Sequence, residues 1–166
     1  MDQRTFNSAL LIGVTAGLRA MTAPALLSLA EQEPGKGRHW LLASPQTARV
    51  LTTMAVGELV FDKLPFAPRR IAPAGLSGRL LSGAMCGAMV SRDDERAGAL
   101  LGIAGALVSS FAGYAIRKGI GRASRLPDAL IALVEDGLAI GIGLAAANMQ
   151  SGEAESVVDM RSAHVA

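Results

Sequence analysis

Charged residues inside apolar stretches are the residues of this chain best suited to chemistry. Glu135 and Asp136 are adjacent carboxylates in the middle of residues 129–149, and Arg19 lies in the middle of residues 8–30. A charge at the centre of a bilayer costs at least about 2.5 kcal/mol, so such groups face one another, water or a ligand. These residues therefore predict where a functional site lies, and they leave open what the site handles.

Three more charged residues extend the candidate site. Arg79 follows Glu58 at a similar depth in the next apolar run, so the two can pair across the hairpin. Asp62 is four residues after Glu58 on the same helix face and could join them near the membrane interface. Two interpretations compete for the whole set. The charges either form buried salt bridges that fix the helix register, or they line a polar site for a small ion or polar solute.

The neighbouring carboxylates favour the polar site. Glu135 and Asp136 point about 100° apart on a helix, so both can hardly meet one partner. Arg19 with either carboxylate is the preferred central contact. Pro24 and Pro65 then predict helix breaks that free backbone groups near the site.

Motifs of soluble enzymes are missing from the sequence. It contains no phosphate-binding loop, nucleophile elbow or zinc-protease helix. His39 and His164 lack metal-ligand spacing. We therefore expect no catalytic residue, no cofactor and no metal. A lipid-acting enzyme would need Glu135 or Asp136 as a general base, and no nucleophile accompanies them.

The elements that must position these residues are apolar runs. Hydrophobic residues make up 51% of the 166 residues, glycine contributes 19, and the mean hydropathy is +0.37. A helix needs about 20 apolar residues to cross a bilayer. The runs that approach this length are residues 6–30, 45–61, 74–91, 97–116 and 127–149.

These runs predict an all-α, polytopic transmembrane bundle of about five spans. The second and third spans are short, so either could be re-entrant. Residues 1–150 form the predicted transmembrane domain, and residues 151–166 a polar, disordered tail. Four G-x-x-x-G pairs predict close helix packing, and they begin at Gly13, Gly83, Gly98 and Gly137. Residues 9–13 faintly resemble 99–102, and residues 56–59 resemble 134–138, which is compatible with an inverted repeat or with chance.

Basic residues predict the orientation of the bundle. They gather in the second and fourth loops with their flanks, at Lys63, Arg69, Arg70, Arg79, Arg117, Lys118, Arg122 and Arg125. Under the positive-inside rule these loops are cytoplasmic, so five spans place the N-terminus in the cytoplasm and the C-terminus outside. The same rule accounts for the sequence pI near 9.1, so we expect no nucleic-acid partner.

Four motifs together resemble a known family. They read G-L-R-A-M-T-A-P (17–24), G-E-L-V-F-D-K-L-P (57–65), P-A-G-L-S-G-R-L-L-S-G-A (73–84) and L-P-D-A-L-I-A-L-V-E-D-G-L-A (126–139). As a set they are similar to small, glycine-rich bacterial inner-membrane proteins of unknown function, over nearly the whole chain. The resemblance implies a multi-pass inner-membrane protein and supplies no activity. The family's recurring positions map to Arg19, Pro24, Gly57, Glu58, Asp62, Lys63, Pro65, Arg79, Glu135 and Asp136.

The sequence thus leads to a small carrier or channel-like protein as the first functional hypothesis. Its partners would be the lipid bilayer and a small ion or polar solute, and the small volume that five short spans enclose is compatible with a homodimer. The alternative is a membrane scaffold or assembly protein that transports nothing and whose charges are internal salt bridges.

Overall fold

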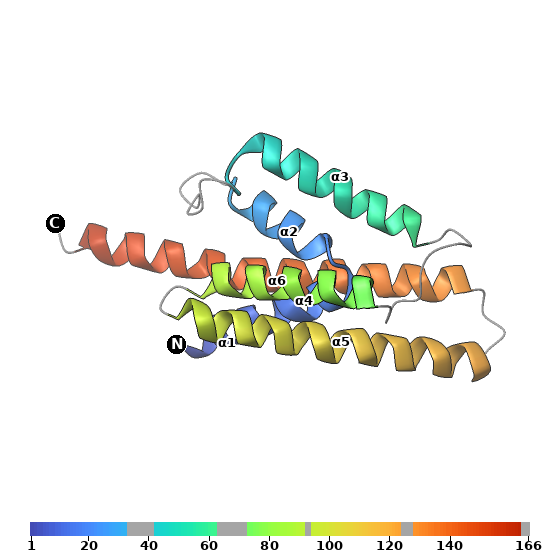
Figure 1. Ribbon diagram of the computed structural model, residues 1–166. Helices are drawn as coiled ribbons and strands as arrows, with labels where there is room; N and C mark the ends of the chain where they lie inside the picture. The colour runs from blue at the N-terminus through green and yellow to red at the C-terminus, as the bar shows by residue number, and fades with distance from the viewer. Residues whose placement is uncertain (33–41, 63–72, 92–93, 124–127, 164–166) are drawn as a thin grey trace.

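The computed structural model describes residues 1–32, 42–62, 73–91, 94–123 and 128–163. Across these ranges the chain forms helices and no strand, which confirms the all-α prediction for this part of the protein. The helices are α1 (Gln3–Leu18), α2 (Thr22–Ala30), α3 (Pro45–Phe61), α4 (Pro73–Val90), α5 (Glu95–Ala123) and α6 (Asp128–Ala163). Their axes run broadly along one direction (Figure 1).

Local sequence explains where several helices begin. The Asp2 carboxylate accepts a hydrogen bond from the Thr5 N–H at 2.7 Å before α1. Asp94 accepts one from the Ala97 N–H at 3.0 Å before α5. Pro45 is the first residue of α3, a position where its missing N–H costs no hydrogen bond. These residues cap or start helices that tertiary packing then holds in place.

Glycines bring the backbones of α1, α4 and α5 into contact. A Cβ placed on Gly13 would overlap the backbone of Gly102, and one placed on Gly102 would overlap the Gly83 carbonyl. Gly87 meets Gly98 in the same way. Small residues at such contacts let helices approach closely. The three helices therefore form a tightly packed core.

The predicted G-x-x-x-G pairs divide into two groups. The three pairs that begin at Gly13, Gly83 and Gly98 lie at the helix contacts of this core. Gly137 and Gly141 of α6 have open space where a Cβ would be. The spacing thus predicts close packing in three helices, and in α6 it marks an open face.

The first apolar run, residues 6–30, is two helices and not one span. The chain leaves α1 at Arg19, whose backbone is extended, with φ −144° and ψ 108°. Thr15 of α1 and Leu26 of α2 both border Gly143 of α6. The chain therefore reverses direction between α1 and α2, and α2 runs back along α6.

Two helices are long and apolar enough to cross a membrane, among those the structure describes. They are residues Glu95–Gly119 of α5 and Leu130–Met149 of α6, with mean hydropathies of 1.8 and 1.9. The predicted five spans are therefore not supported. The reversal leaves α1 with 16 residues and α2 with nine, fewer than the roughly 20 that a crossing needs.

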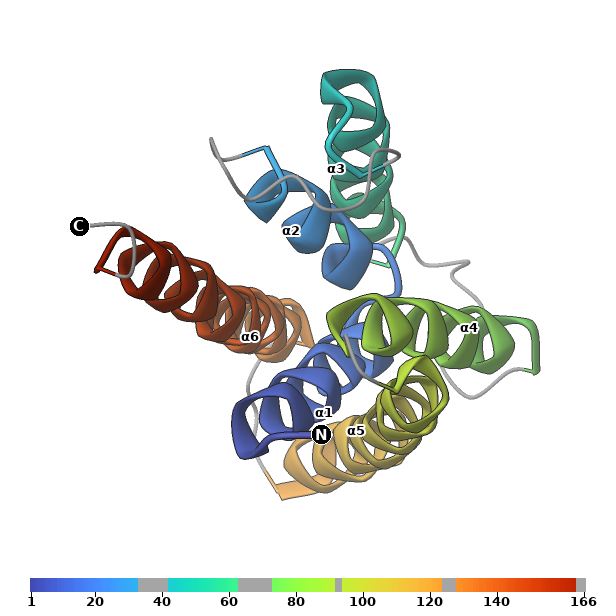
Figure 2. The same ribbon diagram turned by 90° about the vertical axis from the view of Figure 1, so that its left-hand side faces the viewer.

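Helix α1 begins and helix α6 ends at the same end of the bundle (Figures 1 and 2). Five crossings would have placed them at opposite ends, and the extra reversal accounts for the difference. The segment expected to be a disordered tail continues as helix, since α6 reaches Ala163. Residues 151–163 contain no proline and several good helix formers.

Candidate functional site at the Arg19 turn

The Arg19 turn, residues 19–21 between α1 and α2, is where the predicted charges meet. Among the residues whose side chains the structure describes, Arg19 is the largest with no solvent exposure. Its Nε donates a hydrogen bond to Asp136 Oδ1 at 2.7 Å, and its guanidinium forms ion pairs with Asp62 and Asp136. Asp62 ends α3 and Asp136 lies in α6. One arginine therefore joins the α1–α2 reversal to two other helices.

Glu58 of α3 binds the backbone of the same turn. Its Oε1 accepts a hydrogen bond from the Ala20 N–H at 2.9 Å, and its Oε2 accepts one from the Met21 N–H at 2.8 Å. N–H groups at the start of a helix have no intrahelical partner and carry partial positive charge. Both oxygens of Glu58 thus accept hydrogen bonds from the backbone just before α2. The similar depths of Glu58 and Arg79 had instead predicted a pair between these two side chains.

Two serines bind carbonyl oxygens that the end of α1 exposes. Ser82 of α4 donates to the Ala20 carbonyl at 2.6 Å, and Ser110 of α5 donates to the Gly17 carbonyl at 3.0 Å. Sequence reasoning missed both residues. The available signal was a serine beside small residues in an apolar helix, where hydroxyls often bond across to a neighbouring helix.

Pro24 and Arg79 lie close to the turn in different ways. Pro24 is the third residue of α2, in the first turn, where a missing N–H is tolerated, so the break comes just before the proline. Arg79 is 5% exposed in α4, three residues from Ser82 and on the same helix face. Pro65 lies outside the described residues.

Glu135 pairs with a different cation from Asp136, as the angle between adjacent side chains implied. Its Oε2 is 3.9 Å from Arg117 Nη2 of α5. Glu135 and Arg117 both line a cavity of about 660 Å³ between α5 and α6, and Val14 and Leu18 of α1 also line it. We call this cavity the α5–α6 crevice. Asp136 thus binds Arg19, whereas the neighbouring Glu135 lines the α5–α6 crevice.

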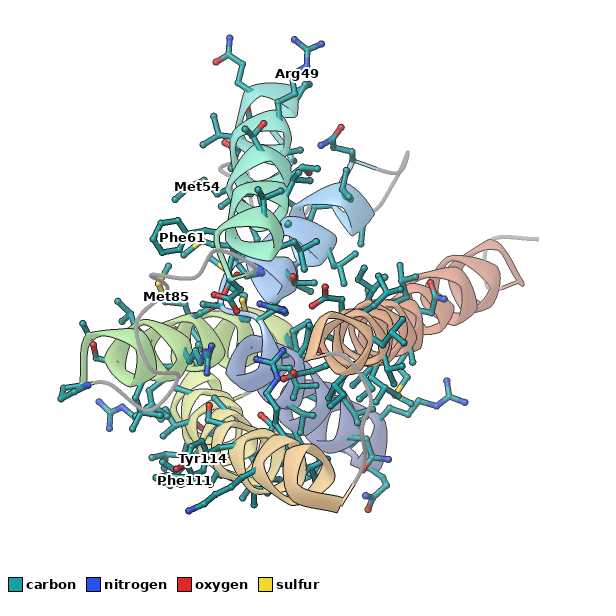
Figure 3. All side chains as sticks on the ribbon, turned by 90° about the vertical axis from the view of Figure 1, so that its right-hand side faces the viewer. Arg49, Met54, Phe61, Met85, Phe111 and Tyr114 are labelled. Atoms are coloured by element: carbon teal, nitrogen blue, oxygen red, sulfur yellow. The ribbon has the colours of Figure 1, made fainter. Side chains whose placement is uncertain are left out.

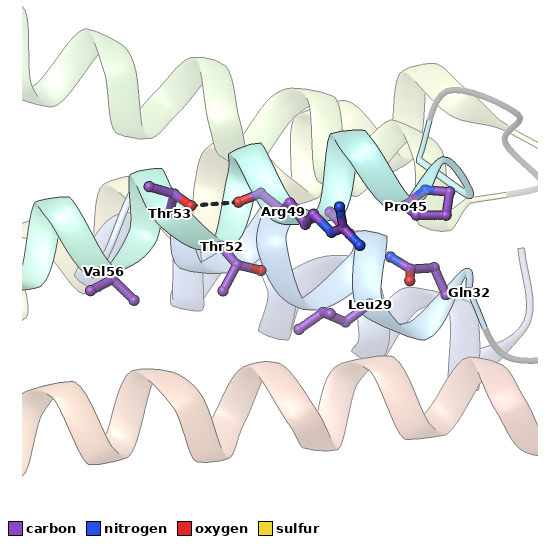
Figure 4. Close-up of a pocket in the computed structure, with 8 residues that line it drawn as sticks. Leu29, Gln32, Pro45, Arg49, Thr52, Thr53 and Val56 are labelled. Carbon is purple, nitrogen blue, oxygen red and sulfur yellow. Dashed lines mark hydrogen bonds between the residues drawn. The ribbon is translucent and has the colours of Figure 1, made fainter.

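A second cavity, of about 540 Å³, lies between α2 and α3 (Figure 4). Leu29 and Gln32 face Arg49 and Thr52 across it. None of the predicted site residues lines this cavity. It therefore adds no charge to the Arg19 turn.

The chemistry of the Arg19 turn is that of a joint between helices. Three carboxylates, one guanidinium and two hydroxyls bind one another or backbone groups. Among the described residues there is no cluster of three or more side chains that could hold a metal ion. Comparisons of the chain with protein-family models, with curated proteins and with solved structures found no match.

Proposed function

We propose that the chain is an integral membrane protein that acts as a scaffold, in which the charges of the Arg19 turn are internal staples. The observation that carries this proposal is the complete burial of Arg19 between carboxylates of α3 and α6. Four backbone groups of the reversal also have side-chain partners. In an apolar environment such groups must be bonded within the protein.

Exposed apolar side chains support the membrane location. Leu100 and Val108 of α5 are each 67% exposed, and Val134 of α6 is 65% exposed. Met54, Phe61, Met85 and Phe111 point away from the bundle (Figure 3) and are about half exposed. Soluble monomers rarely expose contiguous apolar patches larger than a few hundred Å². Lipid would cover these side chains, and the family resemblance favours a bacterial inner membrane.

The arrangement of the helices favours a revised orientation. α5 ends and α6 begins at the end of the bundle opposite the start of α1 and the end of α6 (Figure 1). Arg117 and Lys118 lie near that end, and the positive-inside rule would make it cytoplasmic. Both termini would then lie outside. Reporter fusions after Ala163 and in the segment 124–127 would test this orientation, because a cytoplasmic C-terminal reporter would contradict it.

A carrier or channel-like protein is the second candidate. The observation in its favour is that Glu135, next to Asp136 in sequence, lines the α5–α6 crevice. An ion or polar solute in the crevice would then be one residue away from the central network. In this case Asp136 would exchange partners during transport, whereas in a scaffold it would not.

Arg19→Met separates the two candidates. In a scaffold the variant removes the cation that the Asp62 and Asp136 carboxylates bind, and loss of a buried charge partner costs about 3–5 kcal/mol. The triple variant with Asp62→Asn and Asp136→Asn should recover much of that stability. Thermal unfolding in detergent measures both, with Arg49→Gln, at an exposed position of α3, as a control outside the turn. An unchanged unfolding temperature in Arg19→Met would contradict the scaffold.

A further inference from the structure

The α5–α6 crevice has the shape and lining of a binding site for an amphipathic molecule. α5 and α6 each pack on α1 and barely touch one another, so the space between them is open along the bundle. Its apolar walls include Val108 and Ile116 of α5 and Leu138 and Ile142 of α6. The volume, about 660 Å³, lies within the range of roughly 300–1,000 Å³ that is usual for small-molecule pockets.

The crevice also contains one cation and one anion. Arg117 and Glu135 are 22% and 11% exposed, and the atoms that face each other are 3.9 Å apart, at the outer limit of an ion pair. Arg117 directly follows residues 97–116 of α5, which contain no charged residue. It therefore lies where the uncharged part of α5 ends, the depth at which lipid headgroups begin.

We propose that the α5–α6 crevice binds a zwitterionic phospholipid whose headgroup carries a primary amine, as in phosphatidylethanolamine. The Arg117 guanidinium binds the phosphate, which it matches in charge and in geometry. The headgroup ammonium donates hydrogen bonds to the Glu135 carboxylate. One acyl chain lies along Val108 and Ile142, which lie about 13 Å from Arg117 and about 10 Å from Glu135 along their helices.

Charge complementarity selects this lipid over the other common classes. A phosphatidylglycerol headgroup has the phosphate and no cation for Glu135. A phosphatidylcholine headgroup has a cation without an N–H, so it cannot donate a hydrogen bond to the carboxylate. One charge-assisted hydrogen bond is worth about a tenfold difference in affinity. The crevice should therefore prefer the primary amine by about that factor.

The test uses the full chain, purified in detergent and incubated with equal amounts of dioleoyl phosphatidylethanolamine, phosphatidylcholine and phosphatidylglycerol. Native mass spectrometry then counts the lipids that the protein retains. We expect phosphatidylethanolamine to be about tenfold enriched over both others. Glu135→Gln should abolish the preference over phosphatidylcholine, and Arg117→Gln should lower retention of all three.

Ala112→Phe keeps both charges and fills the crevice, since Ala112 lines it. This variant should lose retained lipid, whereas Leu100→Phe should not, because Leu100 is 67% exposed and lies outside the crevice. Equal retention of the three lipids, or no effect of Ala112→Phe, would mean nonspecific surface lipid and would overturn the proposal.

The inference rests on the membrane location proposed above, and a separate measurement distinguishes the two failures. Release of the chain from membranes by alkaline carbonate would refute the membrane location itself. A chain that resists carbonate and retains the three lipids equally would refute only the lipid site. The stability of Arg19→Met bears on neither result.

Discussion

The core of α1, α4 and α5 is joined by backbone contact, whereas α3 packs on α2 and is tied to the Arg19 turn by charges and hydrogen bonds. Figure 2 shows α1, α4 and α5 grouped together and the α2–α3 pair standing out from them. Apolar side chains gain little from one another in lipid, so helices associate there through small residues and polar contacts. The contacts among α1, α4 and α5 use small residues, and the attachment of α3 to the Arg19 turn uses polar contacts.

The α3 helix has few buried residues and is attached to the Arg19 turn by polar contacts. Among its residues only Ala48 and Ala55 are buried, and Val50 and Val60 are each more than half exposed. Its polar contacts with the Arg19 turn come from its last turn, where Glu58 binds the backbone and the following Asp62 binds Arg19. Attachment of α3 is thus concentrated at one end.

Gly102→Val should disrupt the backbone contacts of the core and should have the largest effect on stability. A Cβ at Gly102 overlaps the backbone of α4, and backbone cannot move aside as a flexible side chain can. Overpacking a tight site costs about 1–3 kcal/mol, and more where nothing can yield, so we expect a loss of about 3 kcal/mol or more. Denaturant unfolding measures it. Gly137→Val is the matched control, and an equal loss there would contradict the contrast.

Glu58→Ala should weaken the polar attachment of α3 to the Arg19 turn and should have a smaller effect on stability. It leaves the Ala20 and Met21 N–H groups without their acceptor, and an unsatisfied buried donor costs about 1–3 kcal/mol. We expect a loss of about 2–3 kcal/mol in unfolding experiments, and faster hydrogen exchange at these two amides. Glu58→Gln keeps one acceptor oxygen and should lose about half as much. Equal losses for Ala and Gln would show that charge, and not acceptance, matters.

The sequence was sufficient for the all-α class and for one central contact of the site. Apolar runs predicted helices, and the isolated charges predicted that Arg19 meets Glu135 or Asp136, of which Asp136 binds it in the structure. The reversal at Arg19 could not be predicted from hydropathy, because a run of 25 apolar residues scores alike as one helix or as two. Pro24 was the local signal, since proline is tolerated in a first helical turn.

The remaining partners of the site depended on the reversal. Once the chain turns at Arg19, freed backbone groups need donors and acceptors, and the fold places Glu58 and Ser82 beside them. The sequence alone does not show which backbone N–H and C=O groups lose their hydrogen-bond partner inside a helix. Asp62 was expected near the membrane interface with Glu58, and only the position of α3 brings it to Arg19.

Ser82→Ala should have a modest effect, because it removes one neutral hydrogen bond to the Ala20 carbonyl. Such a bond contributes about 1 kcal/mol, so we expect a loss of that size in denaturant unfolding. Ser77→Ala on the same helix is the control, since the Ser77 hydroxyl is exposed and bonds only within its own turn. A comparable loss from Ser77→Ala would show that the effect arises from α4 itself.

Gly141→Ala should have the smallest effect, and the opposite sign. A Cβ at Gly141 meets no atom within 4 Å, and alanine is favoured over glycine inside a helix by about 0.5–1 kcal/mol. We therefore expect a slight gain in stability, measured by thermal unfolding in detergent at several protein concentrations. If the variant instead unfolds at a lower temperature and does so only at high protein concentration, this face of α6 packs against a second copy of the chain. In that case the glycine face of α6 would be open only in the monomer, in contrast to the glycine contacts inside the core.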